Sequence, residues 1–344
     1  MIRGAVWGAA AVALAGLALL AWAAQGLHAP AAAAESAQSF TVEAGDTPGR
    51  VASRLERSGL LPPHPIFGPR AFALYARLAG ADRAIKAGEY ELDARMTPAE
   101  ILDKLVSGEV KTHPVTLPEG LRLDEIAGRL EAAGIVSAES FIAHARDPAR
   151  ARGRGIAGDS FEGYLYPETY RFRRGSTPEE VIGRMHDEFG RRWTEADREA
   201  LAASGHSLHE IVTLASIVEK ESALPAERTL VSAVFANRLA RGMLLQTDPT
   251  VIYGIIATRG EFDGNLRRSD LERDTPYNTY VRAGLPPGPI ASASIESIRA
   301  ALSPADVPYL YFVSRNDGTH VFSRTLREHT QAVDRYQRRR GRRS

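Results

Sequence analysis

The stretch His209-Glu-Ile-Val-Thr-Leu-Ala-Ser-Ile-Val-Glu-Lys-Glu-Ser222 has the pattern of a helix that is buried on most sides. At about 100° of rotation per residue, its aliphatic side chains cover a wide arc and leave only a narrow polar strip. A helix this apolar packs inside a core. It nevertheless ends in two carboxylates, Glu219 and Glu221, which lie roughly 160° apart around the axis. At most one of them can therefore face a given cleft.

A carboxyl group at the edge of the apolar arc is partly removed from water, and this raises its pKa. A general acid that works near neutral pH needs such a raised pKa. The alternative is an ordinary helix end with solvated charges, because perturbed carboxylates also occur in purely structural roles. The helical phase alone does not decide between Glu219 and Glu221.

The composition is that of a globular protein, and it excludes several classes of site. The chain has 344 residues, of which 44% are hydrophobic and 25% charged, which suggests about two domains. It contains no cysteine, so disulfides, thiolate catalysis and cysteine-bound metals are excluded. The net charge of +1 gives no global signature of nucleic-acid binding. Residues 339–344 form a basic tail that we expect to be solvated.

The N-terminus carries an apolar run, Gly4–Ala24, of 21 residues without a charge. Such a run is long enough to span a bilayer as a helix, and Arg3 before it favours an orientation with the N-terminus inside the cell. We therefore predict a membrane anchor over residues 1–24 and an alanine-rich linker over residues 25–39. The alternative is a cleaved signal peptide, because small residues follow the run at Trp22–Ala24. Both interpretations place the rest of the chain outside the cytoplasm.

Residues 40–108 predict a small β-α-α-β-α module. A strand-like stretch, Phe40–Thr47, turns at Gly45–Asp46 and leads into an amphipathic helix. A second helix is expected over Pro69–Leu78 and a strand over Gly88–Leu92, and Thr97-Pro-Ala-Glu100 is a capping box that opens a last helix. The module resembles, loosely, the LysM-like units that bind N-acetylated glycans. The alternative is a packing domain without affinity for glycans.

Residues 111–338 predict a larger mixed α+β domain without repeats of the solenoid type. The aromatic stretch Phe161–Phe172 reads as extended chain broken at Pro167, and it is more typical of a core than of a sugar-binding face. The expected elements are a strand at 111–117, helices at 125–133 and 137–145, a flexible loop at 147–158, helices at 178–193, 195–203 and 226–241, a helix starting at Asp248-Pro249, a helical piece at 266–271, a helix at 294–303, a hairpin at 309–322 turning at Asn316–Gly318, and a closing helix at 324–338.

Several motifs along this domain carry a resemblance to a known family. They occur in the family's order and are long enough to be specific. The motifs are Glu162–Glu168 (EGYLYPE), Ala215–Glu221 (ASIVEKE), Phe235–Leu239 (FANRL), Leu245–Gly254 (LQTDPTVIYG), Tyr277–Tyr280 (YNTY), Gly284–Ile290 (GLPPGPI) and Tyr309–Val313 (YLYFV). On these motifs the chain resembles the YceG-like endolytic murein transglycosylases.

The resemblance implies an activity. Such enzymes cut the β-1,4 bond between N-acetylmuramic acid and N-acetylglucosamine inside nascent peptidoglycan strands, and leave 1,6-anhydro ends. The C6 hydroxyl of muramic acid attacks its own C1, so one carboxyl group suffices as acid and then as base, unlike the pair used by ordinary glycosidases. It also implies a protein of the inner (plasma) membrane, with its catalytic domain on the periplasmic or extracytoplasmic side.

The resemblance also assigns roles to residues. It places the catalytic acid at the second Glu of the Glu-Lys-Glu motif, Glu221, with Glu219 as a neighbour that tunes it. The candidates for substrate contacts are Glu162, Glu219, Gln246, Asp248, Asn278 and Tyr280, and the alternative for these residues is a scaffold role. No metal and no cofactor are implied. The expected partners are glycan strands and the membrane, with a peptidoglycan synthase as a further candidate.

Two alternatives remain open on the sequence. The first is a non-catalytic scaffold of the wall-synthesis machinery that binds peptidoglycan through residues 40–108. The second is a two-carboxylate glycosidase, which would need Asp248 or Glu162 as its second acid.

Overall fold

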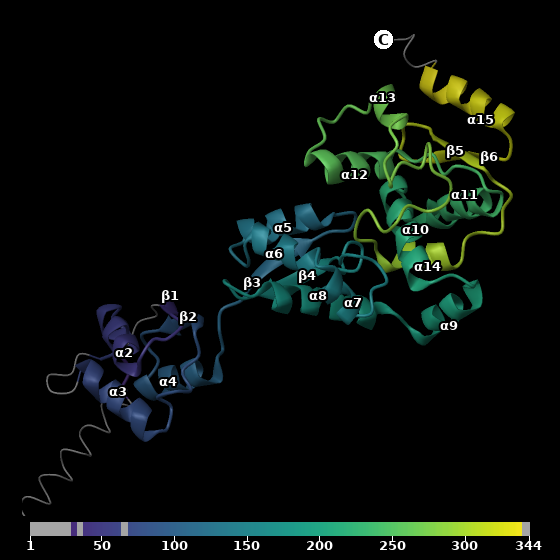
Figure 1. The fold of residues 1–344 in the computed structure, drawn as a ribbon. Helices are drawn as coiled ribbons and strands as arrows, with labels where there is room; N and C mark the ends of the chain where they lie inside the picture. The colour runs from purple at the N-terminus through teal and green to yellow at the C-terminus, as the bar shows by residue number, and fades with distance from the viewer. Residues whose placement is uncertain (1–28, 33–36, 63–67, 339–344) are drawn as a thin grey trace, which may run out of the picture. The chain divides into compact units, whose positions relative to one another are not determined.

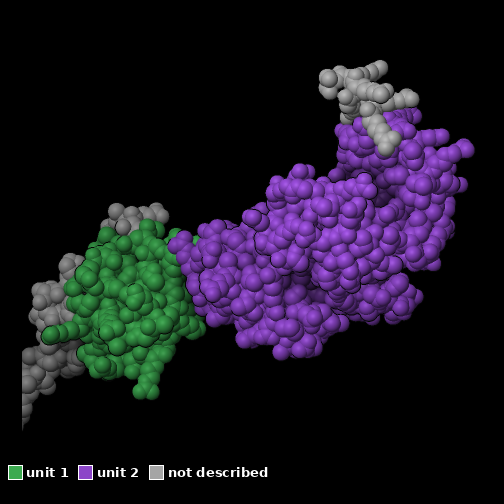
Figure 2. Space-filling view, turned by 45° about the horizontal axis from the view of Figure 1, so that its top comes forward, with its two compact units in different colours: residues 1–113 green, residues 114–344 purple. Residues whose placement is uncertain are grey.

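The computed structural model describes residues 29–32, 37–62 and 68–338. The chain divides into two compact units, residues 1–113 and 114–344 (Figures 1 and 2). Their mixture of helices and short two-stranded sheets agrees with the predicted α+β class. The predicted anchor, most of the predicted linker and the basic tail lie outside the described residues. Within the described ranges, no helix has the length and apolar character needed to cross a membrane.

In its described residues, the first unit is a two-stranded antiparallel sheet with three helices. β1 (Ala37–Val42) pairs with β2 (Gly88–Asp93), with Phe40 opposite Tyr90. The helices are α2 (Pro48–Arg57), α3 (Gly68–Leu78) and α4 (Pro98–Ser107). β1 begins at Ala37, so the last residues of the predicted linker belong to the strand. The unit has a core of its own, which includes Phe40, Val51, Leu55, Phe72, Tyr90, Leu92, Ile101 and Leu105.

The predicted capping box of α4 is confirmed. The Thr97 hydroxyl accepts from the Glu100 N–H at 3.2 Å, and the Glu100 carboxylate accepts from the Thr97 N–H at 2.7 Å. These bonds satisfy donors that have no partner within the helix. Gly108, in the left-handed conformation with φ +76°, ends the helix.

The second unit begins with a similar arrangement. β3 (His113–Leu117) pairs with β4 (Glu168–Phe172), and the helices are α5 (Leu123–Ala132), α6 (Ala138–Ala145), α7 (Pro148–Gly153) and α8 (Pro178–Arg192). The predicted flexible loop at 147–158 is wrong, because α7 lies within it. Asp147 caps this helix by accepting from the Ala149 N–H at 2.8 Å, and Pro148 occupies the first turn. An Asp-Pro start of this kind outweighs the loop-like Ala, Arg and Gly composition that follows.

The two arrangements are copies of one another in sequence. Phe40–Leu61 aligns without a gap on Val115–Val136, and Glu89–Leu105 aligns without a gap on Thr169–Met185. Identical pairs occupy the turn, the first helix, its glycine stop, the second strand and the capping box. They are Thr41/Thr116, Gly45/Gly120, Ala52/Ala127, Arg54/Arg129, Leu55/Leu130, Glu56/Glu131, Gly59/Gly134, Tyr90/Tyr170, Thr97/Thr177, Pro98/Pro178 and Glu100/Glu180.

The hydrogen bonds of the two copies also correspond. The Tyr90 hydroxyl donates to the Lys86 carbonyl at 2.6 Å, and the Tyr170 hydroxyl donates to the Tyr166 carbonyl at 2.7 Å. Gly59 and Gly134 end the equivalent helices with φ of +69° and +70°. Residues 115–185 are therefore a second copy of the module in residues 40–105, built into the second unit.

In the second copy, the turn after the first strand is bound to the rest of the unit. The Gly120 N–H donates to the Ser292 carbonyl at 2.8 Å, and the Ser292 N–H donates to the Leu121 carbonyl at 2.8 Å. Lys220, near the end of α10 (Leu208–Glu221), donates from Nζ to the Gly120 carbonyl at 3.1 Å. The second copy thereby holds both the loop before α14 (Ile295–Leu302) and the end of α10.

Among the remaining elements, α14 and α11 (Arg228–Ala240) pack against α10 (Figure 1). The aromatic side chains of Phe161–Phe172 are buried in the same core, which confirms that they fill a core. Only Glu168–Phe172 of that stretch is a strand. The predicted hairpin is confirmed as β5 and β6. The further elements are α9 (Glu195–Ser204), η1 (Pro225–Glu227), α12 (Asp248–Arg259), α13 (Arg268–Leu271), β5 (Tyr311–Ser314), β6 (His320–Ser323), α15 (Leu326–Val333) and the π-helical turn η2 (Asp334–Arg338).

Candidate active site

The helix α10 is buried on most sides, as the sequence predicts. A capping box of Ser207 and Glu210 begins it, and residues 211–218 are buried. Its polar strip is satisfied within the core, because the Ser216 hydroxyl donates to the Thr213 carbonyl at 2.7 Å and accepts from the Ile290 N–H at 3.0 Å. The strip therefore fixes the helix to the proline-rich loop that ends at Ile290.

The two carboxylates at the end of α10 point to different surroundings, as the helical geometry predicts. Glu219 accepts from the Ser294 N–H at 2.9 Å and from the Ser294 hydroxyl at 2.5 Å, and it pairs with Arg228 at 3.2 Å. It thus binds the start of α14 and α11. Glu219 does not line the cavity described next, and its contacts are those of a structural ion pair.

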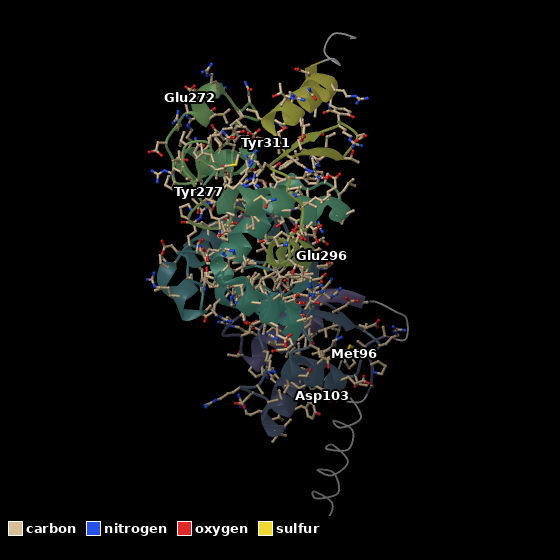
Figure 3. The ribbon with its side chains drawn as sticks, turned by 90° about the vertical axis from the view of Figure 1, so that its right-hand side faces the viewer. Met96, Asp103, Glu272, Tyr277, Glu296 and Tyr311 are labelled. Atoms are coloured by element: carbon tan, nitrogen blue, oxygen red, sulfur yellow. The ribbon has the colours of Figure 1, made fainter. Side chains whose placement is uncertain are left out.

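Glu221 lines a cavity of about 350 Å³ in the second unit. The walls come from the segment before α12, from α11, from β5 and from α15; Tyr311 of β5 is labelled in Figure 3. Nowhere in the described part of the chain do three side chains of His, Asp or Glu form a group that could hold a metal ion. The lining residues are Glu221, Phe235, Arg238, Leu245, Gln246, Asp248, Tyr280, Tyr311, Phe312, Leu326 and His329.

The surroundings of Glu221 favour the protonated form of its carboxyl group. Burial raises the pKa of the Glu221 carboxyl above its usual range, and the nearby negative charge of Asp248 raises it further. The Thr247 hydroxyl donates to Oε1 of Glu221, and this contact acts in the opposite direction on the pKa. Oε2 makes no hydrogen bond to any residue that the structure describes, and it is available to a ligand in the cavity.

Three of the predicted sugar contacts line the same cavity as Glu221, namely Gln246, Asp248 and Tyr280. The Tyr280 hydroxyl donates to Oδ1 of Asp248 at 2.6 Å, and burial together with this bond raises the pKa of Tyr280. The two side chains thus form one hydrogen-bonded polar pair in the lining of the cavity. Asp248 is the first residue of α12, and the cap position expected for it belongs to Thr247.

Asn278, the fourth predicted contact, does not line the cavity and is fully buried. Its amide nitrogen donates to the Arg273 carbonyl at 2.6 Å and to the Leu271 carbonyl at 3.0 Å. Its amide oxygen accepts from the Tyr280 N–H at 2.9 Å. Asn278 therefore fixes the backbone from which Tyr280 reaches Asp248.

Glu162 also lies away from the cavity. It is 3% exposed, and it accepts from the Tyr253 hydroxyl at 3.1 Å and from the Leu123 N–H at 3.2 Å. Burial raises the pKa of Glu162 to about 8. The side chain joins the start of α5 to α12 as a neutral group, and in this position it is not the second acid of a paired-carboxylate site.

The raised pKa of Glu162 predicts a pH-dependent stability. In the unfolded chain the carboxyl ionises near 4.5, whereas in the fold it holds its proton to about 8. The folded state therefore binds more protons in this interval, and stability falls as the pH rises from about 5 to 8. The glutamine of Glu162→Gln does not ionise, so this pH-dependent loss of stability is absent in the variant. We expect its stability relative to wild type to improve by roughly 3–5 kcal/mol across this interval, since one pKa unit corresponds to about 1.4 kcal/mol.

Chemical denaturation of both proteins at pH 5 and pH 8 measures this difference. Other ionisable groups are common to the two proteins and cancel in the comparison. A difference in unfolding free energy that stays constant with pH would contradict the assignment.

Several residues of the cavity were not predicted. Arg238 lies in the motif Phe235–Leu239 that carried the family resemblance, so its position had a signal in the sequence. Leu326 and His329 come from the closing helix, and no feature of the sequence indicated that they line the cavity. Burial and the positive charge of Arg238 lower the pKa of His329, so a neutral imidazole faces the cavity and stacks on Tyr311 at 5.2 Å.

The model of the YceG-like family matches residues 40–335 of the sequence. The chain belongs to the YceG-like family. The match includes α10, the cavity and both copies of the module. The family motifs that carried the resemblance therefore coincide with the elements that build the site.

Named relatives agree with the family. The chain is 33% identical over 313 residues to the endolytic murein transglycosylase of Bacillus subtilis, and the match covers 87% of this chain and 84% of that protein. It is 29% identical over 324 residues to the endolytic murein transglycosylase of Streptococcus pneumoniae strain D39, covering 84% of this chain and 56% of that one. A crystal structure of a YceG-like protein from Listeria monocytogenes superposes with a TM-score of 0.58 at 32% identity, over 87% of this chain and all of that one.

Proposed function

We propose that this YceG-like protein is an endolytic peptidoglycan lytic transglycosylase. It cleaves the β-1,4 bond between N-acetylmuramic acid and N-acetylglucosamine in nascent strands, leaves 1,6-anhydromuramic ends and so terminates strand elongation. The observation that carries the proposal is Glu221, a sheltered carboxyl in a cavity, with one oxygen bound by Thr247 and the other available. The named relatives support it.

One carboxyl group completes this reaction. Glu221 gives its proton to the glycosidic oxygen that leaves with N-acetylglucosamine, and the bond from this oxygen to C1 of muramic acid breaks. The carboxylate then takes the proton of the C6 hydroxyl as that oxygen bonds to C1. The acid is regenerated and no water is consumed. The nucleophile belongs to the substrate and is held close to C1, which removes much of the entropic barrier.

The rest of the cavity suits a sugar chain. The carboxylate of Asp248 and the hydroxyl of Tyr280 offer hydrogen bonds to hydroxyl and N-acetyl groups, and Gln246 adds an amide. The rings of Tyr311 and Phe312 offer apolar faces on which a pyranose can stack.

A product analysis distinguishes this function from ordinary hydrolysis. Purified glycan strands are incubated with the protein, and the fragments are examined by mass spectrometry. We expect internal fragments that end in 1,6-anhydromuramic acid. A glycosidase with Asp248 as its second carboxylate would release reducing ends instead, and a non-catalytic scaffold would release nothing.

We also propose that residues 40–108 form a LysM-like module that holds the glycan strand for the catalytic domain of residues 111–338. The corresponding turn of the second copy is bound to Ser292, whereas Gly45 in the first copy is exposed. Each unit has its own core. We expect residues 114–344 alone to co-sediment with peptidoglycan sacculi roughly tenfold less than residues 37–344, because one of two linked contacts is lost. Equal sedimentation would mean that the module only packs.

Residues 1–24 are proposed as an anchor in the inner (plasma) membrane, with the catalytic domain outside and within reach of a peptidoglycan synthase. The support is the uncharged run Gly4–Ala24 behind Arg3. An anchored chain stays with membranes after a carbonate wash, and a chain starting at residue 25 is released. Release of the full chain as well would contradict the anchor.

A further inference from the structure

We infer that Thr247 is a positioning residue that holds Oε1 of Glu221 and leaves the transferable proton on Oε2. The inference rests on the proposed function and deepens it. Three features of the segment before α12 carry it: a cap position that is not used for capping, a strained residue beside it, and a closed ring of hydrogen bonds behind it.

Thr247 occupies the N-cap position of α12 but makes no capping hydrogen bond. Threonine at this position normally accepts from the N–H two or three residues on, as Thr97, Thr177 and Thr325 do at the starts of α4, α8 and α15. The Thr247 hydroxyl donates instead to Oε1 of Glu221. The local stabilisation of a cap is thus given up for a contact with the carboxyl.

The residue before Thr247 is in an unusual conformation. Gln246 has φ +50°, in the left-handed region that residues other than glycine seldom adopt. The only other such residue that the described ranges contain is Asn316, in the tight turn between β5 and β6, where asparagine is common. The Gln246 N–H donates to the Thr279 carbonyl at 3.1 Å and stabilises this bend. The strain turns the chain so that the next side chain reaches Glu221.

A ring of hydrogen bonds fixes the Thr247 backbone. Its N–H donates to Oγ1 of Thr279 at 3.1 Å, and its carbonyl accepts from the Thr250 hydroxyl at 2.8 Å. The hydroxyls of Thr250 and Thr279 are 2.9 Å apart. Because a hydroxyl has one proton and that of Thr250 is used, Thr279 donates to Thr250 and closes the ring. All three threonines are at most 2% exposed.

The ring decides how Glu221 works as an acid. The Thr247 hydroxyl donates its only proton in a hydrogen bond to Oε1. Oε1 is therefore the carbonyl oxygen of the protonated acid. The acidic proton then resides on Oε2, which makes no hydrogen bond to any described residue. When Glu221 becomes a carboxylate, the same donated bond stabilises its charge. Thr247 thereby orients the proton before transfer and stabilises the anion after it.

Three variants of the full chain test the inference, with kcat and KM measured on peptide-free glycan strands over pH 4–9. Thr247→Val keeps the shape and removes the hydroxyl. Because the hydroxyl stabilises the carboxylate, its loss raises the pKa of the acid. Activity requires the protonated acid, so the alkaline limb of kcat moves up by about one pH unit. We expect kcat to fall roughly tenfold at the optimum with KM nearly unchanged. Thr247→Ser should restore both kcat and the position of the alkaline limb.

Thr177→Val is the matched control, since it removes a threonine that does cap a helix. It lowers the melting temperature by a few degrees and leaves the pH limb in place. If Thr247→Val does not fold, Thr247→Ala carries the same expectations. A folded Thr247→Val with the pH limb and kcat of wild type overturns the inference, and so does a shift that Thr247→Ser does not reverse. If wild type itself forms no anhydro ends, the proposed function fails instead.

Discussion

Glu221→Gln is expected to reduce the formation of anhydro ends by at least about 10³-fold while the protein keeps its fold. The amide has the shape of the carboxyl, but it can neither give a proton to the leaving oxygen nor take one from the C6 hydroxyl. General acid–base groups contribute roughly 10²–10⁴-fold each, and here one group serves in both steps. Cleavage rates from chromatography of the released fragments, with thermal melting in parallel, provide the measurement.

The second carboxylate of the same helix is the matched control. Glu219→Gln leaves the half-buried Arg228 without its partner and weakens the bonds to Ser294. We expect a loss of about 2–3 kcal/mol in stability and a rate for the folded protein within a few-fold of wild type. Glu221→Gln removes a carboxyl whose charged form is destabilised by burial, so its melting temperature should equal or exceed that of wild type. The reverse pattern, with Glu219→Gln inactive and Glu221→Gln active, would show that Glu219 is the catalytic carboxyl and that the assignment of Glu221 is wrong.

Arg238→Met is expected to have the second large effect, this time on stability and activity together. Arg238 is 9% exposed, and its guanidinium donates to the Leu310 carbonyl at 2.7 Å and to the Leu245 carbonyl at 2.7 Å. It thereby joins the residue before β5 to the segment that carries Gln246 and Thr247. Losing these charged hydrogen bonds costs about 3 kcal/mol after the desolvation of the charge is offset.

For a unit of this size, the loss lowers the melting temperature by roughly 6–12 °C. Arg238→Lys keeps the charge but lacks the planar fork of donors, so it should fall between wild type and Arg238→Met. Differential scanning calorimetry of the three proteins, with cleavage rates at a permissive temperature, checks the order. An Arg238→Met protein with the melting temperature of wild type would show that the guanidinium contributes no net stability.

Short-range signals explain why so much of the fold could be predicted. The capping box at Thr97–Glu100, the turn at Asn316–Gly318 and the apolar arc of α10 depend on residues within a turn or two of each other. The same kind of signal was missed at Asp147–Pro148, where the Ala, Arg and Gly that follow read as a loop. The duplication was missed because it is a two-copy repeat of a whole module, interrupted by an insertion between its halves, and not a short tandem period.

The site could be predicted only in part, because its roles depend on contacts that are distant in sequence. Helical phase separates Glu219 from Glu221, but only Ser294 and Arg228 identify Glu219 as the structural one. Asn278 and Tyr280 are two residues apart, and one satisfies backbone carbonyls while the other lines the cavity. Leu326 and His329 reach the cavity because the hairpin and α15 fold back over it.

The most direct test of the account is cleavage of glycan strands in water enriched in ¹⁸O. If the single carboxyl Glu221 directs the substrate's own C6 hydroxyl onto C1, every new muramic end lacks one water relative to a reducing end and carries no ¹⁸O. If the new ends contain ¹⁸O at C1 from the first turnover, water is the nucleophile. In that case a second carboxylate must activate it, and the one-carboxyl mechanism is wrong.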